Sequence, residues 1–119
     1  MNAKALKVLD EVKEAYMGAN FNASTFFKAS IAIPAEDAVD VLMAAFGVRD
    51  PYKPVYNGFC CGELSELPAG SMVFLAREYS PCAYVKLPKG KRFGEKKAFE
   101  AMNISEYNVK DGMIRLWWD

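Results

Sequence analysis

The chain contains no histidine among its 119 residues. Histidine is the side chain whose unperturbed pKa suits acid–base chemistry at neutral pH, and it is also the commonest ligand of zinc. Its absence excludes every Ser–His and Cys–His arrangement for nucleophilic catalysis. The glycines form neither a GxGxxG nor a GxxxxGK[ST] pattern, so no phosphate-binding loop is visible. We therefore expect a protein that is not an enzyme, with no catalytic residue, no metal and no cofactor.

Cysteine is scarce as well, with Cys60, Cys61 and Cys82 the three residues of this type. An odd number without a disulfide spacing, and without a secretory signal at the start of the chain, indicates reduced thiols in a cytoplasmic protein. A disulfide between adjacent residues is strained, and zinc requires four ligands. We therefore expect buried, unreactive thiols, the alternative being a redox pair or half of a metal site.

The sequence also lacks an excess of either charge and lacks long apolar runs. Fifteen basic residues balance fifteen acidic ones, so there is no global attraction to nucleic acid or to an anionic membrane. No stretch approaches the roughly 18 apolar residues of a membrane span. Hydrophobic residues make up 52% of the chain, which excludes disorder as its general state. The length predicts one domain over residues 1–119.

Hydrophobic periodicity predicts alternating helices and strands. The expected elements are a helix over 3–17, a strand over 25–33, a helix from Pro34 to Gly47, two strands within Met72–Leu87 on either side of a break at Glu78–Pro81, a helix over 95–102 and a last strand over 113–118. Ala98, Phe99 and Met102 are expected to face the core from the helix over 95–102.

From residue 25 onward this order predicts an α+β domain with the ferredoxin-like, split βαβ topology, β-α-β-β-α-β. We expect one four-stranded antiparallel sheet with two helices on one face. The helix over 3–17 is an addition, and an Asn-Gly turn at 57–58 predicts an inserted small β-hairpin over 55–60. The alternative is a mixed α+β roll in which the inserted hairpin joins the main sheet.

The second half of the chain resembles an RNA recognition motif. Residues Ser80–Leu87, SPCAYVKL, lie where that family has its third-strand RNP1 octamer, and Ala-Tyr-Val at 83–85 fits the small–aromatic–Val core of the octamer. Glu95–Asn103 is similar to the family's second helix, and 114–116 to its fourth strand. The resemblance implies the same topology and RNA binding by base stacking on aromatics. Cys82 departs from the family's stacking pattern, which leaves Tyr84.

Aromatic side chains near the Asn-Gly turn are candidates for a partner-binding surface. Tyr52, Tyr56 and Phe59 lie close to the turn, and aromatics on a rigid turn bury a large area at low entropic cost. The alternative is that they fold down and close one end of the core. Trp117 and Trp118 point to opposite faces of the last strand, and we include Trp118 among the candidate partner-binding residues.

A basic run provides the alternative candidate site. It contains Lys86, Lys89, Lys91, Arg92, Lys96 and Lys97, with Glu95 as its only acid. Clustered Lys and Arg side chains release counterions when they bind a phosphate backbone. The candidate nucleic-acid-binding residues are Tyr84, Lys86, Lys89, Lys91, Arg92 and Lys97. The alternative interpretation is a solvated loop and helix start.

Glu36, Asp37 and Asp40 share one face of the helix that follows Pro34. Acidic residues in a first helical turn are expected from the helix dipole, which we favour over a divalent-ion site.

These observations together favour a small macromolecule-binding protein, a protein–protein interaction or inhibitor module. Small inhibitors encoded by phages or mobile elements, acting on a host protein complex, have this profile. The alternative is a nucleic-acid-binding module with an RRM-like sheet and the basic run over 86–97. An enzyme would require a pocket around Glu63, Glu78 or a cysteine with a shifted pKa. The oligomeric state stays open.

Overall fold

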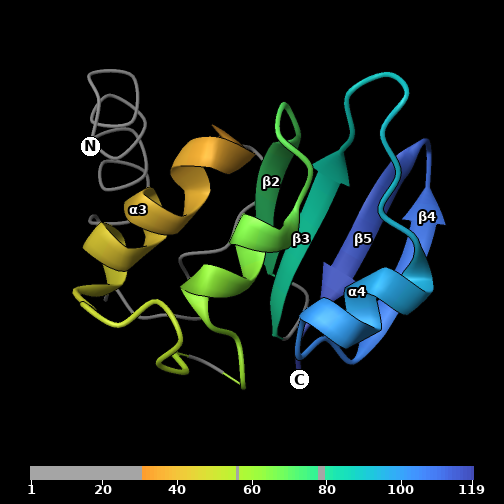
Figure 1. Cartoon of the computed structure of the whole chain (residues 1–119). Helices are drawn as coiled ribbons and strands as arrows, with labels where there is room; N and C mark the ends of the chain where they lie inside the picture. The colour runs from red at the N-terminus through yellow and green to blue at the C-terminus, as the bar shows by residue number, and fades with distance from the viewer. Residues whose placement is uncertain (1–30, 56, 78–79) are drawn as a thin grey trace.

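A computed structural model describes residues 31–55, 57–77 and 80–119 (Figure 1). The expected helix over 3–17 lies outside the described residues. So does the part of the expected strand over 25–33 that precedes residue 31. The elements are β1 (Ile31–Pro34), α3 (Ala35–Phe46), the 3₁₀-helix η1 (Cys61–Glu66), β2 (Met72–Arg77), β3 (Pro81–Lys86), α4 (Glu95–Ala101), β4 (Glu106–Lys110) and β5 (Met113–Trp117).

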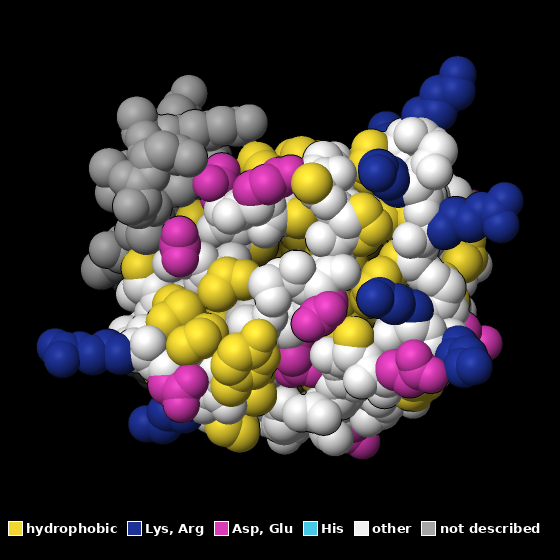
Figure 2. Space-filling model, viewed as in Figure 1, with side chains coloured by type: hydrophobic (Ala, Val, Ile, Leu, Met, Phe, Trp, Pro, Cys, Tyr) yellow, Lys and Arg dark blue, Asp and Glu magenta, His cyan; other side chains and the backbone are white. Residues whose placement is uncertain are grey.

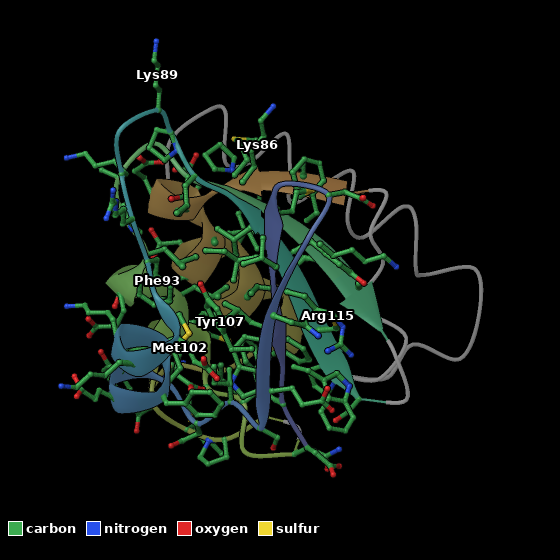
Figure 3. All side chains as sticks on the ribbon, turned by 90° about the vertical axis from the view of Figure 1, so that its right-hand side faces the viewer. Lys86, Lys89, Phe93, Met102, Tyr107 and Arg115 are labelled. Carbon is green, nitrogen blue, oxygen red and sulfur yellow. The ribbon has the colours of Figure 1, made fainter. Side chains whose placement is uncertain are left out.

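The five strands form one antiparallel sheet in the order β1-β2-β3-β5-β4. α3, η1 and α4 lie on the same face of this sheet, as Figures 1 and 3 show from two directions. The predicted α+β class is therefore confirmed, and so is the predicted central hairpin, in which Val73 pairs with Val85 and Leu75 with Ala83.

The ferredoxin-like topology is not confirmed. In a split βαβ unit, the strands joined by the helix are parallel and another strand lies between them. Here β1 and β2 are antiparallel neighbours, with Pro34 opposite Met72. The reason is the segment over 47–71: α3 leads away from the end of β1, and this segment returns the chain to that same end. There the Ala35 N–H donates to the Ser71 carbonyl at 2.8 Å.

α3 begins and ends as its sequence predicts. Pro34 precedes the first turn with φ −58°, an angle that its ring fixes and that suits a helix start. Gly47 follows the last turn in the left-handed region, φ 68°, where a residue without Cβ is favoured. Val41 and Leu42 are fully buried, so the helix packs its apolar stripe against the sheet and η1.

The core lies between the sheet and the three helices. It is built from alternate residues of the strands, from the inner sides of α3, η1 and α4, and from Phe59 and Trp118, which lie outside these elements. Its largest fully buried side chains are Trp118, Phe59, Ile33, Leu42, Leu64, Leu75, Leu116, Val41 and Val73.

The structure differs from the prediction at one residue of α4 and contains one strand, β4, that the hydrophobic pattern does not predict. Ala98 and Met102 are buried as expected, but Phe99 is 43% exposed, because a neighbouring residue is turned about 100° from the buried face of Ala98 on a helix. Four of the five side chains of β4 are exposed, so its sequence has no apolar alternation that would predict a strand. Its hairpin with β5 turns at Asp111 and Gly112, with φ of 52° and 77°.

The inserted segment has the predicted turn and no strand of the sheet within its described residues. Asn57 and Gly58 have positive φ angles of 46° and 78°, the combination that a type I′ turn requires. The Val55 N–H donates to the Phe59 carbonyl at 2.9 Å across this turn. The chain then enters η1, whose Leu64 is buried together with Leu67, the residue after its end.

Across the described ranges, no helix combines the length and the apolar character needed to cross a bilayer.

Candidate functional site

A buried carboxylate organises the end of the molecule that carries the inserted segment. Glu63 is 4% exposed. Its Oε2 accepts a hydrogen bond from the Cys60 N–H at 2.6 Å, and its Oε1 accepts from the Trp118 Nε1–H at 3.2 Å and from the Asn103 N–H. Three donors therefore satisfy one carboxylate, which joins η1, the chain after α4 and the C-terminal residues.

Two of the predicted partner-binding residues belong to this buried centre. Phe59 and Trp118 are both fully buried, and their rings meet edge to face with centroids 4.7 Å apart. Both side chains are therefore part of the core, and Phe59 follows the alternative in which aromatics close one end of the core. A contact of either side chain with a partner stays a prediction. The sequence alone does not predict this burial, because an aromatic beside a turn is equally compatible with a core position and a surface position.

Two of the three thiols lie at the start of η1, and the third lies on β3. Cys60, Cys61 and Cys82 are free and buried, as predicted. Burial raises the pKa of the Cys61 thiol to about 12, and burial with the nearby Glu63 and Asp50 carboxylates raises the pKa of Cys60. Since the thiolate is the reactive form, this environment keeps both groups protonated and unreactive at neutral pH.

Tyr52 is the predicted partner-binding residue that the structure leaves on the surface, with 61% of its side chain exposed. Its N–H donates to the Asp50 Oδ1 at 2.9 Å, and its carbonyl accepts from the Cys60 Sγ at 3.3 Å. Its ring packs so closely on Gly62 that a Cβ there would lie 3.0 Å from two ring atoms. The ring therefore packs on the backbone of η1, which supports one of its faces.

We use the name Tyr52 surface for the half-buried or exposed hydrophobic residues next to Tyr52 in the sequence. They are Phe46, Val48, Pro51, Tyr52, Pro54 and Val55. Figure 2 shows hydrophobic side chains gathered over the end of α3 and the segment after it. Tyr56, the remaining candidate of this group, lies outside the described residues.

The predicted basic site is an exposed segment with a buried anchor. The side chains of Lys86, Lys89, Lys91, Arg92, Lys96 and Lys97 are all exposed. None of the six forms an ion pair with another described residue. Phe93 is 3% exposed, and its carbonyl accepts from the Tyr107 hydroxyl at 2.8 Å. Figure 3 shows Phe93 and Tyr107 inside the molecule while Lys86 and Lys89 point away from it.

Charge is distributed very unevenly over the chain. The segment 86–97 carries six basic residues and one acid, a net charge of +5, so the remainder has nine basic and fourteen acidic residues, a net charge of −5. In Figure 2 several Asp and Glu side chains lie over α3 and others are scattered over the same view, whereas most Lys and Arg side chains lie on the side away from α3. The zero net charge therefore conceals one strongly basic segment in an otherwise acidic chain.

Tyr84 is not on one surface with the whole basic segment. It is half-buried on the sheet face opposite the helices, between Phe74 and Arg115 in the register of the sheet. Lys86 shares that face, because it lies two residues further along β3. Lys97 lies on α4, on the other face of the sheet. Tyr84 and Lys97, two residues of the predicted nucleic-acid-binding set, therefore lie on opposite faces of the sheet.

Within the part of the chain that the structure describes, no three His, Cys, Asp or Glu side chains come close enough to hold a metal ion. Glu36, a residue of the weighed divalent-ion cluster, instead accepts a hydrogen bond from the Gly70 N–H. Comparison with family models, curated proteins and solved structures finds no match for this chain.

Proposed function

We propose that this protein binds another protein through the Tyr52 surface, and that this contact blocks or bridges the partner. The observation that carries the proposal is the position of Tyr52, a residue that is 61% exposed while its backbone is hydrogen-bonded and its ring packs on Gly62. An aromatic that is already ordered loses little entropy when a partner covers it.

The surroundings of Tyr52 support this proposal. Half-buried apolar side chains border it, and Arg49, Asp50 and Lys53 lie exposed at its edges. An apolar centre with a charged rim is the usual arrangement of residues in a protein–protein interface. The Gly62 N–H donates to the Pro51 carbonyl at 2.7 Å, which ties the Tyr52 surface to η1 and so to the buried Glu63.

The test is quantitative affinity purification with the tagged full chain from the cells that naturally produce it. The wild type is compared with Tyr52→Ala and with Phe99→Ala, a control that removes another exposed aromatic from a different element. Losing a binding anchor costs about 2 kcal/mol, so we expect Tyr52→Ala to recover the partner with about 30-fold lower affinity. A protein set that all three baits recover equally would refute the proposal.

A nucleic-acid-binding function is the second candidate, and the exposed, unpaired cations of 86–97 favour it. In this case a labelled single strand of RNA or DNA should bind with an affinity that falls steeply with salt, because each neutralised phosphate releases a counterion. The double variant K89E/K91E should then weaken binding and flatten the salt dependence. A titration without saturation at low salt would exclude this candidate.

A further inference from the structure

A groove lies between α3 and η1, outside the Tyr52 surface. Its volume is about 340 Å³. Ala35, Val39, Leu64 and Leu67 form its apolar floor, with Glu36 and Ser65 at its edges. Ligand pockets begin at roughly 300 Å³, so this groove suits one or two side chains rather than a whole cofactor.

The polar groups at the edges of the groove have local partners. The Ser65 hydroxyl donates to the Gly62 carbonyl at 2.7 Å, and the Glu36 carboxylate accepts from the Gly70 N–H. The two polar side chains of the lining, Ser65 and Glu36, are therefore both hydrogen-bonded. An occupant gains by burying apolar surface there and has no buried hydrogen bond to replace.

The charges around the groove restrict the occupant further. Glu36 and Asp40 are exposed one helical turn apart on α3, and Glu66 is exposed between the groove residues Ser65 and Leu67. At the far end, a Cβ on Gly70 would lie 3.3 Å from Pro88, so the basic segment begins there. The groove thus has the Glu36 carboxylate in its lining, two further exposed carboxylates on the elements that form it, and cations beyond one end.

We propose that the groove binds an extended peptide segment of the protein partner, with an aliphatic side chain on the apolar floor and a Lys or Arg next to it. The cation faces Glu36, Asp40 and Glu66, and the cations beyond Pro88 repel it from the other end. An aliphatic side chain fills an apolar floor of this size, and the surrounding carboxylates complement a positive neighbour.

This inference rests on the proposed function, because the groove and the Tyr52 surface are two ends of one face. Tyr52 packs on Gly62 near the start of η1, and the groove extends to Leu67 beyond its end. A 3₁₀-helix rises about 2 Å per residue, so the two contacts lie on the order of 10 Å apart, about three residues of an extended peptide.

The test is selection of peptides from a displayed library of random heptapeptides against the full chain. We expect enrichment of Leu, Ile or Val one to three residues from Lys or Arg. Val39→Lys places a cation in the groove and should weaken the selected peptides by about tenfold or more. Glu66→Lys with Asp40→Lys should remove the preference for Lys and Arg and leave the aliphatic preference. Lys110→Glu, on the remote β4, is the control and should change neither.

Each outcome has a separate meaning. Enrichment of acidic or aromatic peptides, or peptides that bind Val39→Lys as well as the wild type, would overturn the inference. So would a concentration-dependent dimer in sedimentation that Val39→Lys abolishes, because a second copy would then occupy the groove. Partner recovery that depends on Tyr52 but not on Val39 leaves the proposed function standing and refutes the groove alone. Recovery that depends on neither residue refutes both.

Discussion

Replacing the buried Glu63 carboxylate tests how this end of the molecule is held together. Glu63→Met keeps the length of the side chain and removes both acceptors. It leaves the Cys60 N–H and the Trp118 Nε1–H without partners in a buried site, whereas Asn103 is exposed and its N–H can bind water. A buried donor left unpaired costs about 1–3 kcal/mol, which gives about 2–6 kcal/mol for two.

Two considerations refine this magnitude. Removing a charge from a buried site recovers part of its desolvation cost, so we expect a net loss of about 2–4 kcal/mol for Glu63→Met. Glu63→Gln keeps one oxygen for Trp118 and turns an amide N–H₂ toward Cys60, so it should lose about 1–3 kcal/mol. The expected order of stability is wild type, then Gln, then Met.

Urea denaturation measures these differences in the free energy of unfolding, with Trp118→Phe as the second arm of a double-mutant cycle. Trp118→Phe removes one donor from the carboxylate, so Glu63→Met should cost about 1 kcal/mol less in that background. Wild-type stability in Glu63→Met, or additive effects of the two substitutions to within about 0.5 kcal/mol, would refute the reasoning.

Three further predictions follow from the described contacts. Because the pKa of Cys61 is raised to about 12 in the folded protein, stability should stay constant below pH 9, the usual thiol value, and fall between pH 9 and 12; Cys61→Ala should remove most of that fall in a pH series of thermal melts. Gly62→Ala should displace the Tyr52 ring, and a dequenched or shifted tyrosine fluorescence would report the displacement. Unchanged partner recovery by this variant would contradict the role of the Tyr52 ring in binding. Tyr107→Phe should lower stability by about 1 kcal/mol and increase proteolysis within the basic segment, because the bond to the Phe93 carbonyl is lost.

Local signals predict the elements of this fold well. The stop at Gly47 and the turns at 57–58 and 111–112 depend on residues that tolerate positive φ, and each has a positive φ in the structure. The hairpin of β2 and β3 follows from two apolar runs separated by a short break. These features are decided by neighbouring residues, so the sequence contains the information directly.

The sheet order and the site depend on contacts between distant residues, and the sequence does not display these. The segment 47–71 decides whether β2 lies beside β1, yet its path is set by packing of Leu64 and Leu67 against α3. Glu63 reads as an ordinary charged residue, although its position three residues after Cys60 fits a side chain that returns to the first N–H of a helical turn. Its bond to Trp118 joins residues 55 positions apart.

Glu63 also connects the core to the proposed interaction surface. Its Oε2 holds the Cys60 N–H, and the Cys60 thiol in turn donates to the Tyr52 carbonyl. Gly62 lies between Cys60 and Glu63 along the chain. The Tyr52 ring packs on the Gly62 backbone, and this contact fixes the ring. An exposed aromatic would be a poor anchor if its support could move. A carboxylate fixed by three donors makes that support rigid, so the buried polar group and the exposed ring belong to one arrangement.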